Sequence, residues 1–186
     1  MVVTDSDPQD IHDTKQYLHE YFEMKDLGSL RFFLDIEVNY QYASLFISQI
    51  KYASDLLIRA GVIDNKTADI PLELNLKLRP IDGKILTDSS RYRQLVDSFN
   101  SLTIIWSDIS HAVHVISQFI AESRSVHYAS ILQILRYIKG TLYCGLLFFS
   151  FDLTLCAYSN ADWTGDVTHH RSTIGYCIFF RHSPIA

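Results

Sequence analysis

The sequence predicts an α+β fold, and three observations lead to that class. Apolar residues recur at the spacing of an amphipathic helix in several separate stretches. Runs rich in β-branched and aromatic residues occupy 30–38, 44–47 and 153–158. The chain of 186 residues is 48% hydrophobic, which is enough to bury a sizeable core. Helices and strands should therefore pack together in one or two globular units.

A first helix is predicted to start at Asp7 and Pro8. The Asp7 side chain can accept hydrogen bonds from the free amides of the first turn, and proline suits the first helical position. Asp10 favours the positive end of the helix dipole. The helical repeat that follows consists of Ile11, Thr14, Tyr17, Leu18, Tyr21 and Phe22. Gly28 stops the pattern, and capping explains Asp5, Asp7 and Asp10 without a metal ion.

A hairpin and a second helix are predicted next. The stretches 30–38 and 44–47 flank a short polar turn, so they should pair as two strands. Ser48 is placed to cap a helix that ends at Gly61. The inward positions of that helix are Tyr52, Leu56, Leu57 and Ala60.

The middle of the chain is predicted to be an extended connection followed by three helices. Residues 64–90 contain Pro71, Pro80 and Gly83 and keep no sustained periodicity, so a domain boundary near residue 85 is expected. Apolar stripes wide enough to pack on one another then follow in three stretches, 89–103, 108–122 and 126–139.

Two strands are predicted near the C-terminus, the first over 153–158 and the second over 177–180. Two strands alone are marginally stable, and the second would present an unpaired apolar edge that favours self-association. Cys156 and Cys177 are interpreted as strand-packing residues rather than as a disulfide. The predicted units are therefore 1–85, 86–150 and 151–186.

Charge and composition exclude several classes of protein. The net charge is −5, and residues 1–40 hold nine acidic residues against three basic ones. That balance is unfavourable for a nucleic-acid binder, because neutralisation of phosphates by Lys and Arg supplies most of the sequence-independent affinity. No apolar run approaches the roughly 20 residues that span a bilayer, so no membrane contact is expected. Three cysteines without zinc-type spacing favour a reduced state, in the cytoplasm or the nucleus.

Several stretches carry a resemblance to one family. The run Phe22-Glu23-Met24-Lys25-Asp26-Leu27-Gly28 with its continuation to Ile36-Glu37-Val38 resembles a long signature of copia-type retrotransposon reverse transcriptases. Shorter matches follow in that family's order and at compatible spacings, over 45–53, 92–96, 108–113 and 135–141. The stretch 157–166 is similar to the opening hairpin of the ribonuclease H domain of the same polyproteins. The resemblance implies the end of the polymerase palm, the thumb and connection helices, and the start of ribonuclease H.

The resemblance also implies residues that contact a primer–template of RNA or DNA. Phe33 and Asp35 correspond to the primer-grip region, and Lys51 and Arg59 lie in the expected first thumb helix, where they could contact phosphate. Taken alone, Lys51 and Arg59 are ordinary solvated charges, and that alternative stays open. Asp35 stands where the family usually has glycine, so it adds a side chain at a close approach and a charge that repels phosphate.

The chain departs from the family's pattern in its middle part as well. Asp97 replaces a usual glycine, and Trp106 with Ser107 replaces a usual Arg-Pro pair. These changes are expected to remove a phosphate clamp and to add an exposed tryptophan.

The intact family uses Mg²⁺, but no cofactor is expected here. Asn160 stands where the first ribonuclease H aspartate is usual, and a neutral amide binds Mg²⁺ poorly. Asp162 is left as a vestigial metal ligand, and the alternative for it is a solvated loop residue. Two wider groups of possible metal ligands occur, but each lacks the further ligands that a metal site needs. The first is Asp162 with Asp166, His169 and His170, and the second is Asp108, His111, His114 and His127.

The predicted function is that of a degenerate fragment of a copia-type RNA-directed DNA polymerase and ribonuclease H, without catalysis of its own. By the resemblance, the polymerase aspartates would precede Met1 and the remaining ribonuclease H acids would follow Ala186, so both active sites are expected to be cut. The alternative is a retained nucleic-acid-binding or protein-interaction module. A hydrolase of another kind is disfavoured, since no nucleophile, base and orienting group occur together.

Overall fold

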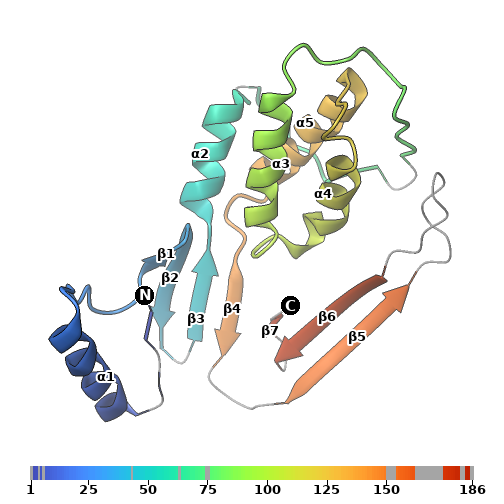
Figure 1. Cartoon of the computed structure of the whole chain (residues 1–186). Coiled ribbons are helices and arrows are strands. Elements are labelled where there is room, and N and C mark those ends of the chain that lie inside the picture. The colour runs from blue at the N-terminus through green and yellow to red at the C-terminus, as the bar shows by residue number, and fades with distance from the viewer. Residues whose placement is uncertain are drawn as a thin grey trace.

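The computed structural model describes residues 2–3, 5, 7–42, 44–62, 64–73, 76–149, 154–161, 174–180 and 183–184, and these form helices and two sheets (Figure 1). The helices are α1 (Pro8–Tyr21), α2 (Ile50–Ala60), α3 (Ser90–Leu102), the 3-10 turn η1 (Ser107–Ile109), α4 (Ser110–Ser117) and α5 (Ser125–Gly140). The strands are β1 (Phe32–Phe33), β2 (Ile36–Gln41), β3 (Ser44–Ser48), β4 (Leu146–Phe149), β5 (Leu155–Ala161), β6 (Ile174–Phe180) and β7 (Ser183–Pro184). The predicted α+β class is confirmed.

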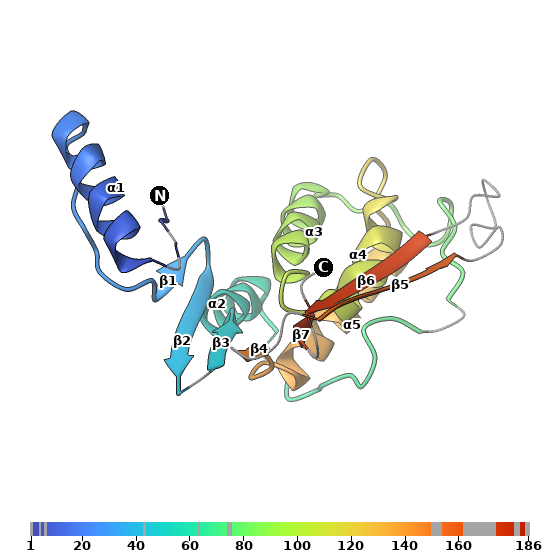
Figure 2. The same ribbon diagram turned by 90° about the horizontal axis from the view of Figure 1, so that it is seen from below.

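Helices α2, α3, α4 and α5 share one hydrophobic core and form a helical unit (Figures 1 and 2). The helices predicted over 89–103 and 126–139 are confirmed as α3 and α5. The helix predicted over 108–122 is shorter, because η1 precedes α4 and α4 ends at Ser117. The contribution of α2 to the shared core consists of Ala53, Leu56, Leu57 and Ala60. The boundary predicted near residue 85 stays a prediction.

Tyrosines from two of the family-like stretches tie the helical unit together. The Tyr92 hydroxyl of α3 donates to the Ile116 carbonyl of α4 at 2.7 Å, and burial raises the pKa of Tyr92. The Tyr137 hydroxyl of α5 donates to the Asp108 carboxylate of η1. That hydrogen bond, together with burial, raises the pKa of Tyr137 to about 12. Each tyrosine therefore joins two elements that are distant in sequence.

Trp106 is buried, so the prediction of an exposed tryptophan is wrong. The side chain is 3% exposed, and its indole N–H donates to the Thr141 hydroxyl oxygen at 3.0 Å. The ring adds a large apolar surface to the core while its one donor is satisfied, which is the arrangement that buried tryptophan requires. Trp106 thus fastens the segment before η1 to the end of α5.

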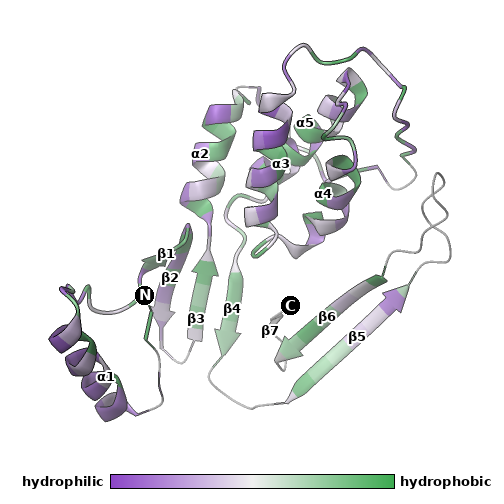
Figure 3. Cartoon of the chain, viewed as in Figure 1, coloured by the Kyte–Doolittle hydropathy of each residue, from purple (hydrophilic) through white to green (hydrophobic). Residues whose placement is uncertain are grey.

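The strands β1, β2, β3 and β4 form an antiparallel sheet in that order. The hairpin of β2 and β3 confirms the predicted pairing. The single strand predicted over 30–38 is wrong, because a two-residue turn at Leu34 and Asp35 separates β1 from β2. Strand β4 was not predicted, and it pairs with β3 in the register Leu45 to Phe148. Figure 3 shows β3 and β4 as largely hydrophobic strands.

Helix α1 has its predicted start but no buried residue. The Asp7 side chain accepts the Gln9 backbone N–H at 2.8 Å, which confirms the cap. The helix ends at Tyr21, earlier than the predicted stop at Gly28. Both views place α1 away from the helical unit (Figures 1 and 2). An ion pair of Lys15 with Asp26 at 3.0 Å holds the following segment against the helix.

The second sheet has three antiparallel strands in the order β5-β6-β7. Strand β6 lies between the other two, since it pairs with β5 along its length and with β7 at Phe179 and Phe180. The predicted unpaired edge over 177–180 is therefore wrong at these two residues, while self-association stays a prediction. Cys156 and Cys177 are free, and they are not opposite each other, because Cys156 pairs with Phe179 and Cys177 pairs with Tyr158.

Within the described parts of the chain, none of the helices combines the length and the apolar character needed to cross a membrane.

Candidate nucleic-acid interface

The start of α2 is capped by a residue of the neighbouring strand. The predicted cap at Ser48 is wrong, because the N-cap residue is Gln49 and its side chain caps nothing. Instead the Glu37 carboxylate accepts the Lys51 backbone N–H at 2.8 Å and the Ser48 hydroxyl at 3.5 Å. A carboxylate at a helix start is also favoured by the helix dipole. Glu37 therefore fixes the hairpin against α2.

The Lys51 side chain lies beside the first strand of the hairpin. Its ammonium nitrogen is 5.9 Å from the centre of the Phe32 ring, which is within the range of a cation–π contact. Phe32 pairs with Glu37 across the ladder, and Phe33 pairs with Ile36. Because successive strand residues point to opposite faces, Phe33 does not share the face of Lys51 and Phe32. The structure thus brings together Lys51 and Phe32, but not Lys51 and Phe33.

Asp35 occupies the second position of the turn between β1 and β2. Its φ is 64°, and that of Leu34 is 47°, so both residues adopt the left-handed conformation of a tight hairpin turn. Glycine adopts this conformation without strain, which gives a physical reason for the glycine that the family usually has at this position. Aspartate tolerates it better than most residues do.

Replacing Asp35 with glycine is expected to stabilise the hairpin by about 0.5 to 1 kcal/mol, because the left-handed strain is relieved. The readout is hydrogen exchange of the Val38 amide, which donates to the Arg31 carbonyl at 2.8 Å across the hairpin. The matched control is Asp35→Ala, which removes the same charge but keeps a Cβ. Its Val38 amide should exchange faster than in the parent chain, and equal protection in the two variants would contradict the backbone argument.

Arg59 lies further along α2 and is exposed. It follows Lys51 by eight residues, which corresponds to about 12 Å along the helix axis. Beyond it, the Arg91 guanidinium donates to the Ala60 carbonyl at 2.7 Å and thereby satisfies the C-terminal end of α2. Arg59 and Lys51 are therefore two separate cations on one helix, too far apart to bind the same phosphate.

Acidic side chains accompany these cations. Asp55 is exposed on α2 between Lys51 and Arg59, and Asp35 and Glu37 belong to the adjoining hairpin. Since each carboxylate repels phosphate, the surface offers little net attraction to a nucleic-acid backbone. The arrangement can support a weak contact, at most one phosphate for each cation.

The predicted metal residues do not form a site in the described part of the chain. Asp162, with Asp166, His169 and His170, lies outside the described residues. Asn160 is exposed on β5 and pairs with Gly175. Among the residues that the structure describes, no three His, Cys, Asp or Glu side chains come together to hold a metal ion. The side chains described here therefore do not make up a paired-Mg²⁺ site, which needs several carboxylate oxygens.

The second predicted cluster is dispersed. His127 is buried at the start of α5, whereas His111 and His114 are exposed on α4. Asp108 is engaged by the Tyr137 hydroxyl. These four side chains therefore do not bind a metal ion together: two of them have structural roles and two are exposed to solvent.

Two residues of the candidate interface were missed by sequence reasoning. Glu37 lies inside the long family-like stretch, yet its capping role depends on pairing with β3 and was not visible locally. Phe32 is adjacent to Phe33, and the alternation of strand side chains would have separated their faces once the turn was placed correctly.

Comparisons with known proteins agree on one group. A family model described as reverse transcriptase (RNA-dependent DNA polymerase) matches residues 1–74. The whole chain is 37% identical to part of the retrovirus-related Pol polyprotein from transposon RE1 of Arabidopsis thaliana and spans 13% of that protein. It is 30% identical, over its full length, to 15% of the corresponding polyprotein from transposon TNT 1-94 of Nicotiana tabacum.

A shorter relative is matched over most of its own length. An uncharacterized mitochondrial protein of Arabidopsis thaliana is 36% identical over 87% of this chain, and the match covers 68% of the relative. No solved structure matches the chain.

Proposed function

This chain belongs to the copia-type reverse transcriptase family of transposon Pol polyproteins, and we propose that it is a degenerate member without catalysis of its own. One observation carries the proposal: two acidic side chains of its family-like stretches already have hydrogen-bond partners within the chain. The Glu37 carboxylate accepts the Lys51 backbone N–H at the start of α2, and the Asp108 carboxylate accepts the Tyr137 hydroxyl.

The metal-ligating side chains of the chain support the same proposal. Two-metal phosphodiester chemistry needs anionic oxygens that bridge both ions. Asn160 supplies a neutral amide at the position where the family usually has aspartate. The acidic residues described elsewhere are spread over separate elements and form no metal-holding group within the described ranges.

Titration calorimetry with Mg²⁺ and with Mn²⁺ tests whether the chain lacks the carboxylate oxygens that hold two metal ions. The purified chain is expected to bind neither ion with a dissociation constant below the millimolar range. Asn160→Asp should add at most one weak site, since one carboxylate cannot hold two ions. Two tightly bound ions in the parent chain would overturn the proposal.

A second candidate function is a weak nucleic-acid contact through α2 and the adjoining hairpin. The observation that favours it is the placement of Lys51 beside the exposed Phe32, with Arg59 exposed on the same helix. An aromatic ring and a cation side by side can contact a base or sugar and a phosphate together. The acidic neighbours limit the expected affinity to the range of about 10⁻⁴ M or weaker, the weak end of non-specific binding.

Fluorescence anisotropy with a labelled primer–template duplex measures this contact over a range of salt concentrations. Lys51→Ala and Arg59→Ala are each expected to lower the slope of log K against log salt by about one, the effect of losing one phosphate contact. Lys77→Ala is the matched control, because Lys77 is an exposed cation of the connecting segment and not of α2. If all three variants change the slope equally, or binding is independent of salt, the second candidate fails.

A further inference from the structure

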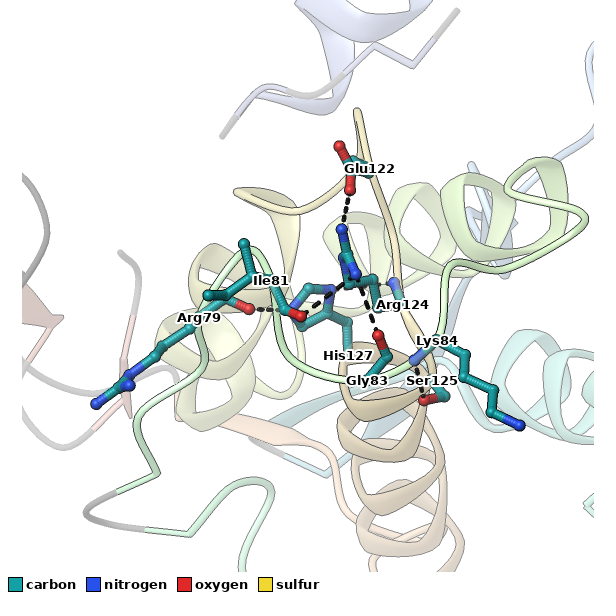
Figure 4. A network of polar contacts seen from close by, with 8 residues as sticks. All are labelled: Arg79, Ile81, Gly83, Lys84, Glu122, Arg124, Ser125 and His127. Atoms are coloured by element: carbon teal, nitrogen blue, oxygen red, sulfur yellow. Dashed lines mark hydrogen bonds and ion pairs between the residues drawn. The ribbon is translucent and has the colours of Figure 1, made fainter.

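The segment 79–86 is fastened across the start of α5 by backbone hydrogen bonds. Ile85 and Arg124 form an antiparallel bridge. On either side of it, the Ser125 N–H donates to the Lys84 carbonyl at 2.8 Å and the Leu86 N–H donates to the Ser123 carbonyl at 3.0 Å. The Lys84 N–H also donates to the Ser125 hydroxyl oxygen at 3.1 Å (Figure 4). The segment is therefore held by a short ladder rather than by side-chain packing alone.

The Arg124 side chain adds a second attachment. Its guanidinium donates to the carbonyls of Ile81 at 3.3 Å and Gly83 at 3.1 Å, and it forms an ion pair with Glu122. Figure 4 shows these partners arranged around the guanidinium. The Arg124 side chain thus binds the bend of the segment, while the Arg124 backbone takes part in the bridge.

The His127 ring contacts both the Arg124 backbone and the segment 79–86. Its side chain is fully buried and stacks on the Phe119 ring with the centres 3.9 Å apart. Nδ1 lies 3.1 Å from the Arg124 backbone nitrogen, and Nε2 lies 3.1 Å from the Arg79 carbonyl oxygen. An amide N–H can only donate and a carbonyl can only accept. The ring must therefore be neutral, with its proton on Nε2.

Protonation of His127 breaks this pattern. A proton on Nδ1 faces the Arg124 N–H, so that two donors oppose each other and one hydrogen bond is lost. The charged ring is also cut off from water, and the Arg124 guanidinium lies close to it. Asp82, from the segment 79–86, is the other charged group that acts on the ring. Glu122 is paired with Arg124, and the Arg79 guanidinium is directed away from the ring in Figure 4.

Burial, with a smaller contribution from the Arg124 charge, lowers the pKa of His127 below its ordinary value of 6.5, although the Arg79 carbonyl and Asp82 act in the opposite direction. A histidine that titrates lower in the closed form than in the open form binds more protons when open. The closed form is therefore fully favoured above about pH 6.5 and loses its advantage as the pH falls through the lowered pKa.

We propose that His127 is a pH-sensitive latch, which fastens the segment 79–86 to the start of α5 while its ring is neutral and releases that segment when the ring is protonated. The helical core stays folded in the released form, because its buried members lie outside the segment 79–86, from which Leu86 packs against the core while Ile81 and Ile85 are exposed. The proposal does not depend on the function proposed above, since it concerns a different part of the molecule.

Hydrogen exchange of the full chain at about pH 7.5 and about pH 5, corrected for intrinsic exchange rates, measures the latch. The reporters are the amides of Lys84, Leu86 and Ser125, which donate the hydrogen bonds of the ladder. Their protection should fall at the lower pH, by up to about tenfold for each unit by which the closed form depresses the pKa of His127. The Tyr92-containing core of α3 should keep its protection.

Two variants and one titration decide the outcome. His127→Gln keeps a donor and an acceptor but cannot be charged, so its protection should not change between the two pH values. His114→Gln, at an exposed histidine of α4, should respond as the parent chain does. Titration of the His127 ring by NMR in the parent chain should give a pKa below 6.5. Protection that is independent of pH in the parent chain, a pH response that survives in His127→Gln, or a ring pKa of 6.5 or higher would overturn the proposal.

Discussion

Trp106→Ala is expected to lower the free energy of unfolding by about 3–5 kcal/mol. The side chain is 3% exposed and belongs to the core shared by α2–α5. Its removal leaves a cavity and also deprives the Thr141 hydroxyl of its indole partner. Urea unfolding followed by far-ultraviolet circular dichroism measures the loss.

Trp106→Phe separates the two contributions. It keeps most of the apolar volume but removes the indole N–H, so it should cost about 1 to 2 kcal/mol, less than the alanine variant. A loss below about 1 kcal/mol in Trp106→Ala would mean that the ring is solvated, as the sequence alone had suggested, and would contradict its place in the core.

Gly83→Ala is expected to lower the free energy of unfolding by about 2–5 kcal/mol. The φ of Gly83 is +83°, which costs a residue with a side chain about 1–2 kcal/mol. A Cβ at this position would also lie 2.6 Å from Ser125 Oγ and 2.9 Å from Val126 Cγ2, and such overpacking costs about 1–3 kcal/mol. The same urea titration measures the change.

Gly28→Ala is the matched control, since its φ of +77° is nearly the same but a Cβ there would meet nothing within 4 Å. This variant should show the backbone cost of about 1–2 kcal/mol and no more. Equal losses in the two variants would show that the close approach of Gly83 to the start of α5 does not affect stability.

Local signals were read correctly from the sequence. The Asp7 cap depends on atoms two residues apart, and the apolar repeats of α3 and α5 are regular enough to place both helices within a residue or two. The left-handed residue that ends α2 is Gly61, as predicted. In each case the interaction that decides the structure lies within one or two helical turns.

Features that depend on distant partners were not predicted. Strand β4 pairs with β3, which lies about a hundred residues earlier, and Trp106 is buried in the core shared by α2–α5, with its indole bound to Thr141. The turn at Leu34 and Asp35 lacks the Asn-Gly or Asp-Gly pair that identifies such turns, so a β-rich stretch concealed it.

The candidate interface was predicted in part for the same reason. Lys51 and Arg59 were placed on one helix, and the resemblance to a known family selected them from many charged residues. The cap by Glu37 and the contact of Lys51 with Phe32 require the hairpin to be docked on α2, which depends on the tertiary fold.

The most direct test of the central claim, that this chain performs no phosphoryl transfer by itself, is a product assay with the purified full chain. A labelled primer–template and an RNA–DNA hybrid are incubated with Mg²⁺ or Mn²⁺, and extension and cleavage products are separated by gel electrophoresis. We expect no product above the protein-free blank, for the parent chain and for Asn160→Asp alike, because one restored carboxylate does not complete a two-metal site. Metal-dependent extension or cleavage that co-purifies with the parent chain would contradict the claim.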